Sequence, residues 1–551
     1  MRSLRAGPLT LLLGEEGDLR RISLGGLEVV RRLYFALRDR NWNTIPARVA
    51  DLEVRDRGRA FEIRYRATHR AGEIDFRWRA SIQGNEQGEI RFEAAGQAYS
   101  DFLRNRIGLC VHHPLRECAG LRVRVNGRQS EFPRLVSPHQ VFTDFRQMRY
   151  TLLPGLDVEL RFEGEIFETE DHRNWGDANY KTYGTPLRLP FPVAVKKGEE
   201  IRQQISVRLS GTVPDILPRR EEPQLTLDGR WRALPPIGFA YTPGSAASGL
   251  GPAHVRVDIR LGESPPRLDV PLELAAHLAP GHERDQLRAL APWKSALARL
   301  LVFHEKERVT SMSWLELARQ TLPGVTVVGG TNMWFAELNR ERPPLPAPPV
   351  AFALSPQVHA SDELSMVENL EAFPQMLESA SYFLKGAPVH VTPVTLKPRF
   401  NPVATDPGAP FENTDPRQSS DFAAAWTLGA LASLLQGGPA SLTFYETAGP
   451  RGLEDRGRRF PVYYLFEAIA SYYGGEFAPT SFPGALRLRK GRRQALLLAN
   501  LEGTARQFEL PAIAGKHVRV RRPGGNELEP ASSRRVEMPP WGVLICEWDS
   551  A

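Results

Sequence analysis

The sequence predicts a multidomain protein with all-β and α/β parts: a large N-terminal antiparallel β-sandwich, a central (β/α)8 barrel of the TIM type and a small C-terminal β-sandwich. Three observations predict this order. Apolar and polar residues alternate as far as about residue 209, eight apolar runs then alternate with helical patterns, and the alternation returns near the C-terminus. A chain of 551 residues is long enough for about three domains. We expect their boundaries at residues 1–215, 235–475 and 476–551.

The first predicted domain depends on a period of two residues. Side chains of a strand point to alternate faces, so this period indicates strands with one face in a core and the other in water. Repeated over this length, it predicts a sandwich of about a dozen strands or more. The clearest strands are 61–70, 73–82, 89–98, 121–129, 157–167 and 203–211.

A stretch rich in proline and charge, about residues 212–235, is a reasonable linker to the second domain. After it, continuous apolar segments alternate with amphipathic ones, which is typical of a parallel sheet covered by helices. Eight such segments predict a closed barrel. They are residues 237–242, 254–261, 270–278, 298–305, 325–330, 350–360, 388–396 and 440–449.

The predicted barrel has one irregular connection. Only GESPPRLD, residues 262–269, separates the second strand from the third, and this is too short for a crossover helix. We therefore expect the barrel to be degenerate there. Past a helical pattern at 458–473, alternating segments from 485 to 548 predict the C-terminal sandwich.

Composition excludes several functions. The formal charge is +7, but both signs are mixed along the chain and no basic tail or helix occurs, so we expect no nucleic-acid partner. No apolar run approaches the roughly 20 residues of a membrane span, and we expect no membrane partner and a cytoplasmic protein. Phosphate-loop, dinucleotide, zinc-peptidase and serine-nucleophile motifs are absent from the sequence, and we expect neither a cofactor nor a metal.

The run EGEIFETEDHRNWGDANYKTYGTPLRLPFPV, residues 163–193, is the most unusual stretch of the chain. It mixes charged and amide side chains with large aromatic ones, which indicates a polar network inside folded protein. The stretch is therefore either a ligand site or a fully hydrogen-bonded domain interface. Its candidate substrate-binding residues are Arg173, Asn174, Trp175 and Lys181.

Active sites of such barrels lie at the C-terminal ends of the strands, where this sequence places polar residues repeatedly, among them Asp258, His277 and Glu305. Glu446 directly follows the last apolar strand, and Glu337 lies in the loop after the fifth. Two carboxylates at the mouth could divide acid and base roles. The alternative to a catalytic role for Glu337 is a salt bridge to Arg340.

His359 is the third catalytic candidate, as a general base or a ligand, and a structural hydrogen-bonding role is equally open. The remaining candidates carry amide or guanidinium groups that can bind hydroxyls, a carboxylate or an oxyanion. They are Asn332, Asn339, Arg340, Gln357, Arg399 and Asn401.

With these residues in place, the chain resembles the D-apionate lactonase family. The resemblance lies in residues 162–192, in GGTNMWFAELNR, SPQVHASDELSMVENL and VTPVTLKPRFNP of the barrel, and in FYETAGPRG before its last helix. It implies the three-part architecture and hydrolysis of D-apionolactone to D-apionate in bacterial sugar catabolism. The sequence departs from the family pattern at His172, at GESPPRLD and at Asn332-Met333, and the resemblance identifies no catalytic residue.

Two enzymatic hypotheses follow, both with a small sugar-derived substrate. The first is a hydrolase that opens a sugar lactone, with water activated by Glu446 or His359. The second is a glycoside hydrolase of the TIM-barrel type, against which the seventh strand counts because it ends in Lys397 and Arg399 and not in an acid. A carbohydrate-binding protein without activity is the third possibility.

Overall fold

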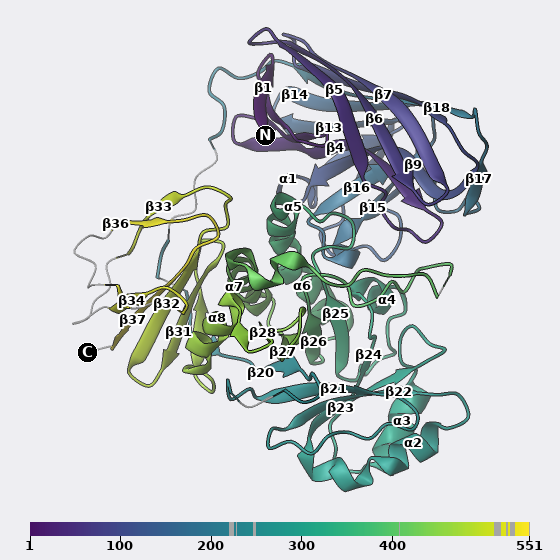
Figure 1. Ribbon diagram of the computed structural model, residues 1–551. Coiled ribbons are helices and arrows are strands. Elements are labelled where there is room, and N and C mark those ends of the chain that lie inside the picture. The colour runs from purple at the N-terminus through teal and green to yellow at the C-terminus, as the bar shows by residue number, and fades with distance from the viewer. Residues whose placement is uncertain are drawn as a thin grey trace. The chain divides into compact units, whose positions relative to one another are not determined.

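The computed structural model describes residues 1–219, 225–227, 229–245, 249–406, 408–511, 519–524, 527–528 and 535–549 (Figure 1). The chain forms two compact units. The first contains Met1–His172, Ala178–Glu222 and Asn401–Phe411, and the second contains Arg173–Asp177, Pro223–Phe400 and Glu412–Ala551. Among the described residues, no helix has both the length and the apolar character needed to cross a membrane.

The first unit is a sandwich of two nine-stranded antiparallel sheets, which confirms the predicted N-terminal fold. One sheet has the order β1 (Arg2–Ala6), β2 (Leu9–Leu13), β3 (Leu19–Leu24), β4 (Leu27–Asp39), β9 (Phe102–Pro114), β16 (Asn179–Tyr183), β15 (Phe167–Asp171) and β12 (Phe142–Phe145), with β17 (Val193–Val195) also paired to β9. The other has the order β11 (Arg128–Glu131), β10 (Arg122–Val125), β13 (Gln147–Leu153), β14 (Leu156–Glu163), β18 (Glu200–Gly211), β8 (Glu89–Ala98), β7 (Ile74–Gly84), β6 (Phe61–Ala71) and β5 (Ala47–Asp56). The short helix α1 (Leu115–Cys118) follows β9.

The alternation in the sequence explains why these strands form a sandwich. In β7, Phe76 and Trp78 are buried, whereas Arg77 and Arg79 between and after them are exposed. The ring of Trp78 stacks on Phe35 of β4 at 4.3 Å between centroids, so side chains of the two sheets meet in one core.

The second unit contains a closed barrel of eight parallel strands, and all eight predicted segments supply a strand. They are β20 (Ile237–Ala240), β21 (His254–Ile259), β22 (Leu272–Leu278), β23 (Leu297–His304), β24 (Val327–Gly330), β25 (Val350–Leu354), β26 (Val389–Val394) and β27 (Ser441–Glu446). The connection from β21 to β22 contains no helix, as GESPPRLD predicted. Strand β25 is shorter than the predicted 350–360, because the chain turns at Ser355-Pro356.

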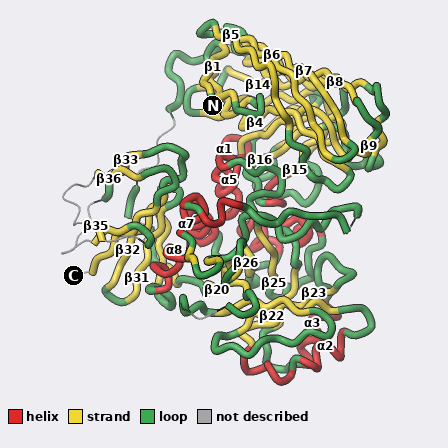
Figure 2. The backbone as a smooth tube through the Cα atoms, in the orientation of Figure 1, coloured by secondary structure: helices red, strands yellow, loops and turns green. Residues whose placement is uncertain are grey.

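Helices surround the barrel strands, whereas the first unit consists almost entirely of strands and loops (Figure 2). The α-helices of this unit are α2 (Glu283–Ala289), α3 (Met312–Thr321), α4 (Phe335–Arg340), α5 (Glu363–Glu368), α6 (Phe373–Phe383), α7 (Asp421–Gln436) and α8 (Pro461–Ala470). Short 3-10 helices are η2 (Ala291–Ala296), η3 (Asn369–Ala372) and η4 (Pro416–Ser419). Helix α7 is buried on all sides over most of its length, because apolar residues occupy every face of it.

The C-terminal strands form the predicted small sandwich, but its two sheets are unequal. A seven-stranded sheet has the order β19 (Arg232–Ala233), β30 (Glu476–Pro479), β31 (Ala485–Lys490), β32 (Arg493–Ala499), β37 (Val543–Asp549), β34 (Arg519–Arg521) and β35 (Glu527–Leu528), and β33 (Arg506–Glu509) pairs with β36 (Arg535–Met538). A small hairpin of β28 (Glu454–Asp455) and β29 (Arg458–Arg459) precedes α8. The edge strand β19 comes from the predicted linker, and α7 contacts β30, β31, β32 and β37. The barrel and these sheets thus belong to one compact unit.

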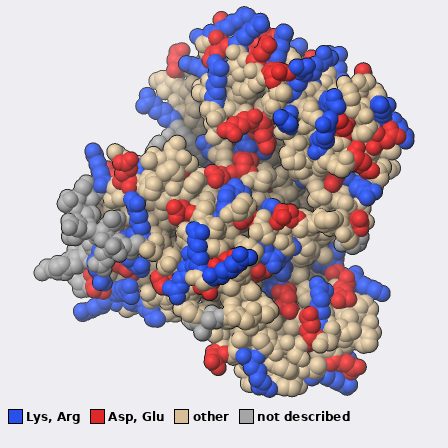
Figure 3. All heavy atoms as spheres, in the orientation of Figure 1, with Lys and Arg blue, Asp and Glu red and all other residues tan. Residues whose placement is uncertain are grey.

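Charge is spread over the surface in both signs. Figure 3 shows Lys and Arg interspersed with Asp and Glu over the visible face. The excess of seven positive charges in the whole chain is therefore not gathered into a patch on this face.

Candidate active site at the mouth of the barrel

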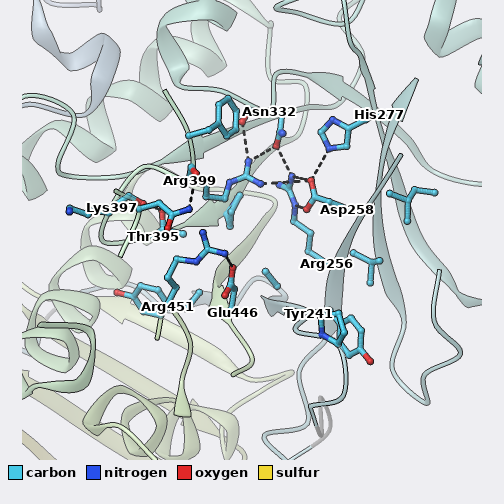
Figure 4. Close-up of a pocket in the computed structure, with 18 of the residues that line it drawn as sticks. Tyr241, Arg256, Asp258, His277, Asn332, Thr395, Lys397, Arg399, Glu446 and Arg451 are labelled. Carbon is cyan, nitrogen blue, oxygen red and sulfur yellow. Dashed lines mark hydrogen bonds and ion pairs between the residues drawn. The ribbon is translucent and has the colours of Figure 1, made fainter. Parts of the chain in front are cut away.

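A cavity of about 670 Å³ opens at the C-terminal ends of the barrel strands (Figure 4). Strands β20, β21, β22, β26 and β27 contribute lining residues, as do the loops that follow β24, β26 and β27. The side chains that bear charge or can titrate on its wall include Arg256, Asp258, His277, Arg399, Glu446 and Arg451.

Arg256 and Asp258 alternate on β21 and therefore point to the same side of the strand. The guanidinium of Arg256 donates to both carboxylate oxygens of Asp258, from Nε to Oδ2 at 2.9 Å and from Nη2 to Oδ1 at 2.8 Å. Such paired hydrogen bonds fix both the position and the orientation of a carboxylate. Arg256 is fully buried, whereas the Asp258 side chain keeps 35% of its surface exposed. The pair therefore presents a carboxylate, and not a guanidinium, to the cavity.

A second guanidinium reaches the same place from the loop after β26. Arg399 donates through Nη2 to the backbone carbonyl and the side-chain oxygen of Asn332, and its Nη1 lies 3.8 Å from Oδ1 of Asp258. Arg256 also donates to the Asn332 side chain, at 2.7 Å. Burial and the neighbouring charge of Arg256 lower the pKa of Arg399 to about 9, against the opposing effect of Asp258.

These cations keep Asp258 ionised. Burial by itself would raise the pKa of this carboxyl group, but the charge and hydrogen bonds of Arg256, the hydrogen bond from His277 and the charge of Arg399 hold the pKa well below its usual range. The imidazole of His277, at the end of β22, contributes with Nε2 at 2.9 Å from Oδ1 of Asp258. Figure 4 shows the four side chains Arg256, Asp258, His277 and Arg399 turned toward one another around this carboxylate.

Glu446 stands on the other side of the cavity at the end of β27. The neighbouring strand β20 pairs with Phe444 and next with Glu446, so Tyr445 forms a bulge, with φ at 26°. Bulges turn side chains in a new direction and are frequent beside functional sites. The Glu446 carboxylate, 26% exposed, accepts a hydrogen bond from Nη2 of Arg451.

Below the mouth, the barrel interior contains a further carboxylate, which is fully buried. Glu273 of β22 accepts from Arg299 Nη1 at 2.5 Å, from Thr443 Oγ1 at 2.8 Å and from Thr392 Oγ1. Burial would raise the pKa of Glu273, but the surrounding cations lower it to about 2. Because Thr392 also accepts from Arg256, the two carboxylates are joined through one hydroxyl and one guanidinium.

Three of the predicted site residues line this cavity: Glu446, Asn332 and Arg399. Gln357 lies just behind the wall, where its Nε2 donates to the carboxylate of Asp415, a lining residue, at 2.5 Å.

The other predicted residues of the second unit gather elsewhere. Arg173, Asn174, Trp175, Glu337, Asn339, Arg340 and His359 do not line the cavity. Asn339 donates to Asn174 at 3.0 Å, Arg173 donates to Gln375 at 2.6 Å, and the Arg340 guanidinium lies 5.1 Å from the centre of the Trp175 ring.

Two of these residues were candidates for catalysis. His359 bonds Asp177 through Nδ1 at 2.7 Å, and its ring contacts Trp175 edge-on. Glu337 is 2% exposed in α4, and burial raises its pKa despite the charge of Arg340. Its carboxylate is 4.0 Å from Arg308. The ion pair of Glu337 is thus with Arg308 and not the expected one with Arg340, and His359 is hydrogen-bonded inside the second unit.

Lys181 and Asn401 belong to the first unit. Lys181 is buried on β16, with Nζ 5.5 Å from the centre of the Tyr183 ring, and Asn401 donates to the backbone carbonyl of Asn41 at 2.7 Å.

Sequence reasoning passed over Arg256 and Arg451, and it noted Asp258 and His277 only among the polar residues that end the predicted strands, without selecting them as site residues. A signal for Arg256 and Asp258 exists: an Arg and an Asp two positions apart, near the end of an otherwise apolar barrel strand, must share its inner face. No local pattern indicates that Arg399 and Asn332 meet them, because that contact depends on barrel closure.

Comparison with known proteins identifies the family of this architecture. The profile of the D-apionate lactonase N-terminal domain matches residues 1–212, and that of the D-apionate lactonase TIM barrel domain matches residues 265–474. The chain belongs to the D-apionate lactonase family. A D-apionate lactonase from Brucella anthropi is 30% identical over 514 residues, which cover 82% of this chain and 83% of that protein. As a member of this family, the protein is a hydrolase.

Solved structures of sugar-acting enzymes are also similar to the chain. A GH30 endoxylanase from Clostridium papyrosolvens has 9% identity and a TM-score of 0.39, covering 60% of this chain and 100% of its own. A GH39 β-xylosidase from Caulobacter crescentus has 12% identity and a TM-score of 0.39, covering 58% of this chain and 98% of its own.

Proposed function

We propose that this member of the D-apionate lactonase family hydrolyses a sugar-derived lactone, D-apionolactone or a close relative, to the aldonic acid in the cavity at the barrel mouth. One observation carries the proposal: the cavity combines proton acceptors with guanidinium groups at its wall. Lactone opening needs both, because water must lose a proton while the ring carbonyl gains negative charge.

The guanidinium groups fit the charge that develops in this reaction. When water adds to the ring carbonyl, its oxygen becomes an oxyanion, and the reaction ends with a carboxylate. Arg399 and Arg451 line the cavity with donors suited to such groups, and Asn332 adds an amide beside Arg399. Glu446 and His277 are among the lining side chains that can accept the proton of water.

Glycoside cleavage fits this cavity less well. A retaining glycosidase needs two carboxyl groups about 5 Å apart, one of which begins protonated. Here Arg256 and its neighbours hold Asp258 ionised, and Arg451 is bonded to Glu446. The seventh barrel strand, β26, is followed at the cavity by Lys397 and Arg399, and not by an acid.

The test is acid release by the purified protein on a panel of aldonolactones that includes D-apionolactone, followed with a pH indicator, beside a panel of aryl glycosides. We expect lactone turnover and no glycoside cleavage. Glu446→Gln should lose activity, whereas Glu337→Gln, whose carboxylate is buried away from the cavity, should keep it. If the protein hydrolysed none of the lactones but cleaved glycosides, this result would contradict the proposal.

A further inference from the structure

The two ring nitrogens of His277 have different surroundings. Nε2 is 2.9 Å from Oδ1 of Asp258. Among the residues that the structure describes, none hydrogen-bonds Nδ1, and this nitrogen is not fully buried. His277 lines the cavity, so the exposed nitrogen belongs to a side chain of the cavity wall.

The partner of Nε2 decides which nitrogen carries the proton. An ionised carboxylate can only accept a hydrogen bond, so Nε2 must donate to Asp258. The neutral ring then has its lone pair on Nδ1. The exposed nitrogen of this cavity-lining ring is therefore a proton acceptor.

Asp258 is in turn held in place by a network of hydrogen bonds that extends into the barrel interior. Arg256 grips both its oxygens, and Arg256 Nη1 donates to the backbone carbonyl of Thr392 at 2.6 Å and to its hydroxyl at 3.1 Å. The Thr392 hydroxyl gives its own proton to Glu273, so its oxygen is free to accept from Arg256. A continuous series of hydrogen bonds thus links the barrel interior to His277 through Thr392, Arg256 and Asp258.

Glu446, the other acceptor, already has a partner on the cavity wall. The guanidinium of Arg451 donates to its Oε1, so one of its two oxygens is occupied. Glu446 with Arg451 is better placed to bind substrate hydroxyls or the product carboxylate.

We infer that His277 is the base that activates water here and that Asp258 positions it, an inference that rests on the proposed lactone hydrolysis. Nδ1 takes one proton from water as the water oxygen bonds the ring carbonyl carbon, and the π electrons of that carbonyl move to its oxygen. When the intermediate collapses, the bond from carbon to the ring oxygen breaks, and Nδ1–H returns its proton to that oxygen. The new carboxylic acid releases its proton to solvent, which balances the reaction.

The experiment compares wild type with His277→Ala and Asp258→Asn on the lactone that wild type opens fastest. We expect kcat to fall by about 10²–10⁴-fold in His277→Ala, the usual share of a general base, with a much smaller change in KM. Added imidazole should restore part of the rate in His277→Ala and none in Asp258→Asn, which still has its own ring. The control is His304→Gln at the end of β23, whose ring stacks on Trp314 and does not line the cavity. It should keep wild-type kcat.

The outcomes separate this inference from the proposed function. Lactone turnover by wild type together with an unchanged kcat in His277→Ala would overturn the inference alone and leave Glu446 as the base. No lactone turnover by wild type would overturn the proposed function itself. If His277→Ala does not fold, His277→Gln replaces it, since its amide can still donate to Asp258. The same loss of kcat without rescue is then expected, and an unchanged kcat would overturn the inference.

Discussion

At the mouth of the barrel, each guanidinium nitrogen of Arg256 has at least one acceptor: Asp258 for Nε, Thr392 for Nη1, and Asp258 with Asn332 for Nη2. A planar fork with five donors can satisfy this arrangement, and an ammonium group cannot. Both the carboxylate and the amide of the cavity wall therefore depend on one buried side chain.

Arg256→Lys is expected to lower the free energy of unfolding by at least about 1.5–3 kcal/mol, the value of one hydrogen bond to a charged group. Thermal unfolding of wild type and variant measures it. Arg260→Lys is the matched control, because Arg260 is 62% exposed and pairs with Glu305 at 3.5 Å, and it should shift the midpoint little. Equal shifts for both variants would contradict the role given to Arg256.

Glu273→Gln tests the carboxylate inside the barrel through pH. Its pKa is lowered to about 2 in the folded protein, below the roughly 4.3 of an unfolded glutamate. A depressed pKa contributes stability that is present above the unfolded pKa and is lost as the pH falls toward the folded one. We expect the variant to melt well below wild type at pH 7, and the gap in melting temperature to narrow steadily below about pH 4.3.

Calorimetry at a series of pH values from 7 to 3 measures this gap. The control is Glu316→Gln on the exposed face of α3, for which no gap should appear at any pH. A gap for Glu273→Gln that stays constant down to pH 3 would show that the carboxylate has an ordinary pKa.

Among the elements, strand β20 is closely constrained by its neighbour β21 at Gly238. Gly238 pairs with His254 of β21, and a Cβ on Gly238 would lie 2.3 Å from the carbonyl oxygen and 2.5 Å from the ring of His254. That ring cannot move freely, because its Nε2 is 2.8 Å from Thr443 Oγ1 inside the barrel.

Gly238→Ala is expected to destabilise the barrel by about 1–3 kcal/mol, as overpacking of a core usually does. Thermal unfolding of the purified variant measures the change. Gly249→Ala, in the loop between β20 and β21, is the control, since among the described residues its added methyl would meet only the Tyr463 hydroxyl, at 3.5 Å. An unaffected Gly238→Ala would mean that β20 and β21 can separate at this point.

The sequence predicts elements of this fold better than it predicts the contacts of the site. Every barrel strand is an apolar run, and such runs are visible in one dimension. His359, however, was placed near the end of a strand over 350–360, whereas β25 ends at Leu354 and His359 lies in the following loop. The residues that surround Asp258 come from β21, β22 and the loops after β24 and β26, and only the closed barrel brings these together.

In the whole molecule, the C-terminal sheets are not an independent attachment. They share a compact unit with the barrel, and the ring of Phe422 in α7 contacts Trp541, in the loop before β37, edge-on at 4.9 Å between centroids. Helix α7 is apolar on every face, so it needs cover on the side away from the barrel as well.

A chain that ends at Gly475 is therefore expected to be largely insoluble, or to bind a dye for exposed apolar surface, since this cover is removed. Soluble yield and size-exclusion chromatography measure the outcome, with a chain that ends at Asp549 as control. A soluble, compact protein with residues 1–475 alone would show that the predicted boundary at 475 separates independent folding units.

The division of the chain into two units affects which segments can be exchanged between genes of this family by recombination. Each unit includes a short piece whose neighbours in sequence belong to the other: Arg173–Asp177 in the second, and Asn401–Phe411 in the first. A recombination event with a single breakpoint near residue 222 would bring together pieces that evolved with different partners. Genes of this family should therefore exchange their two halves rarely, and an engineered chimera should carry residues 173–177 and 401–411 with the unit that each one joins.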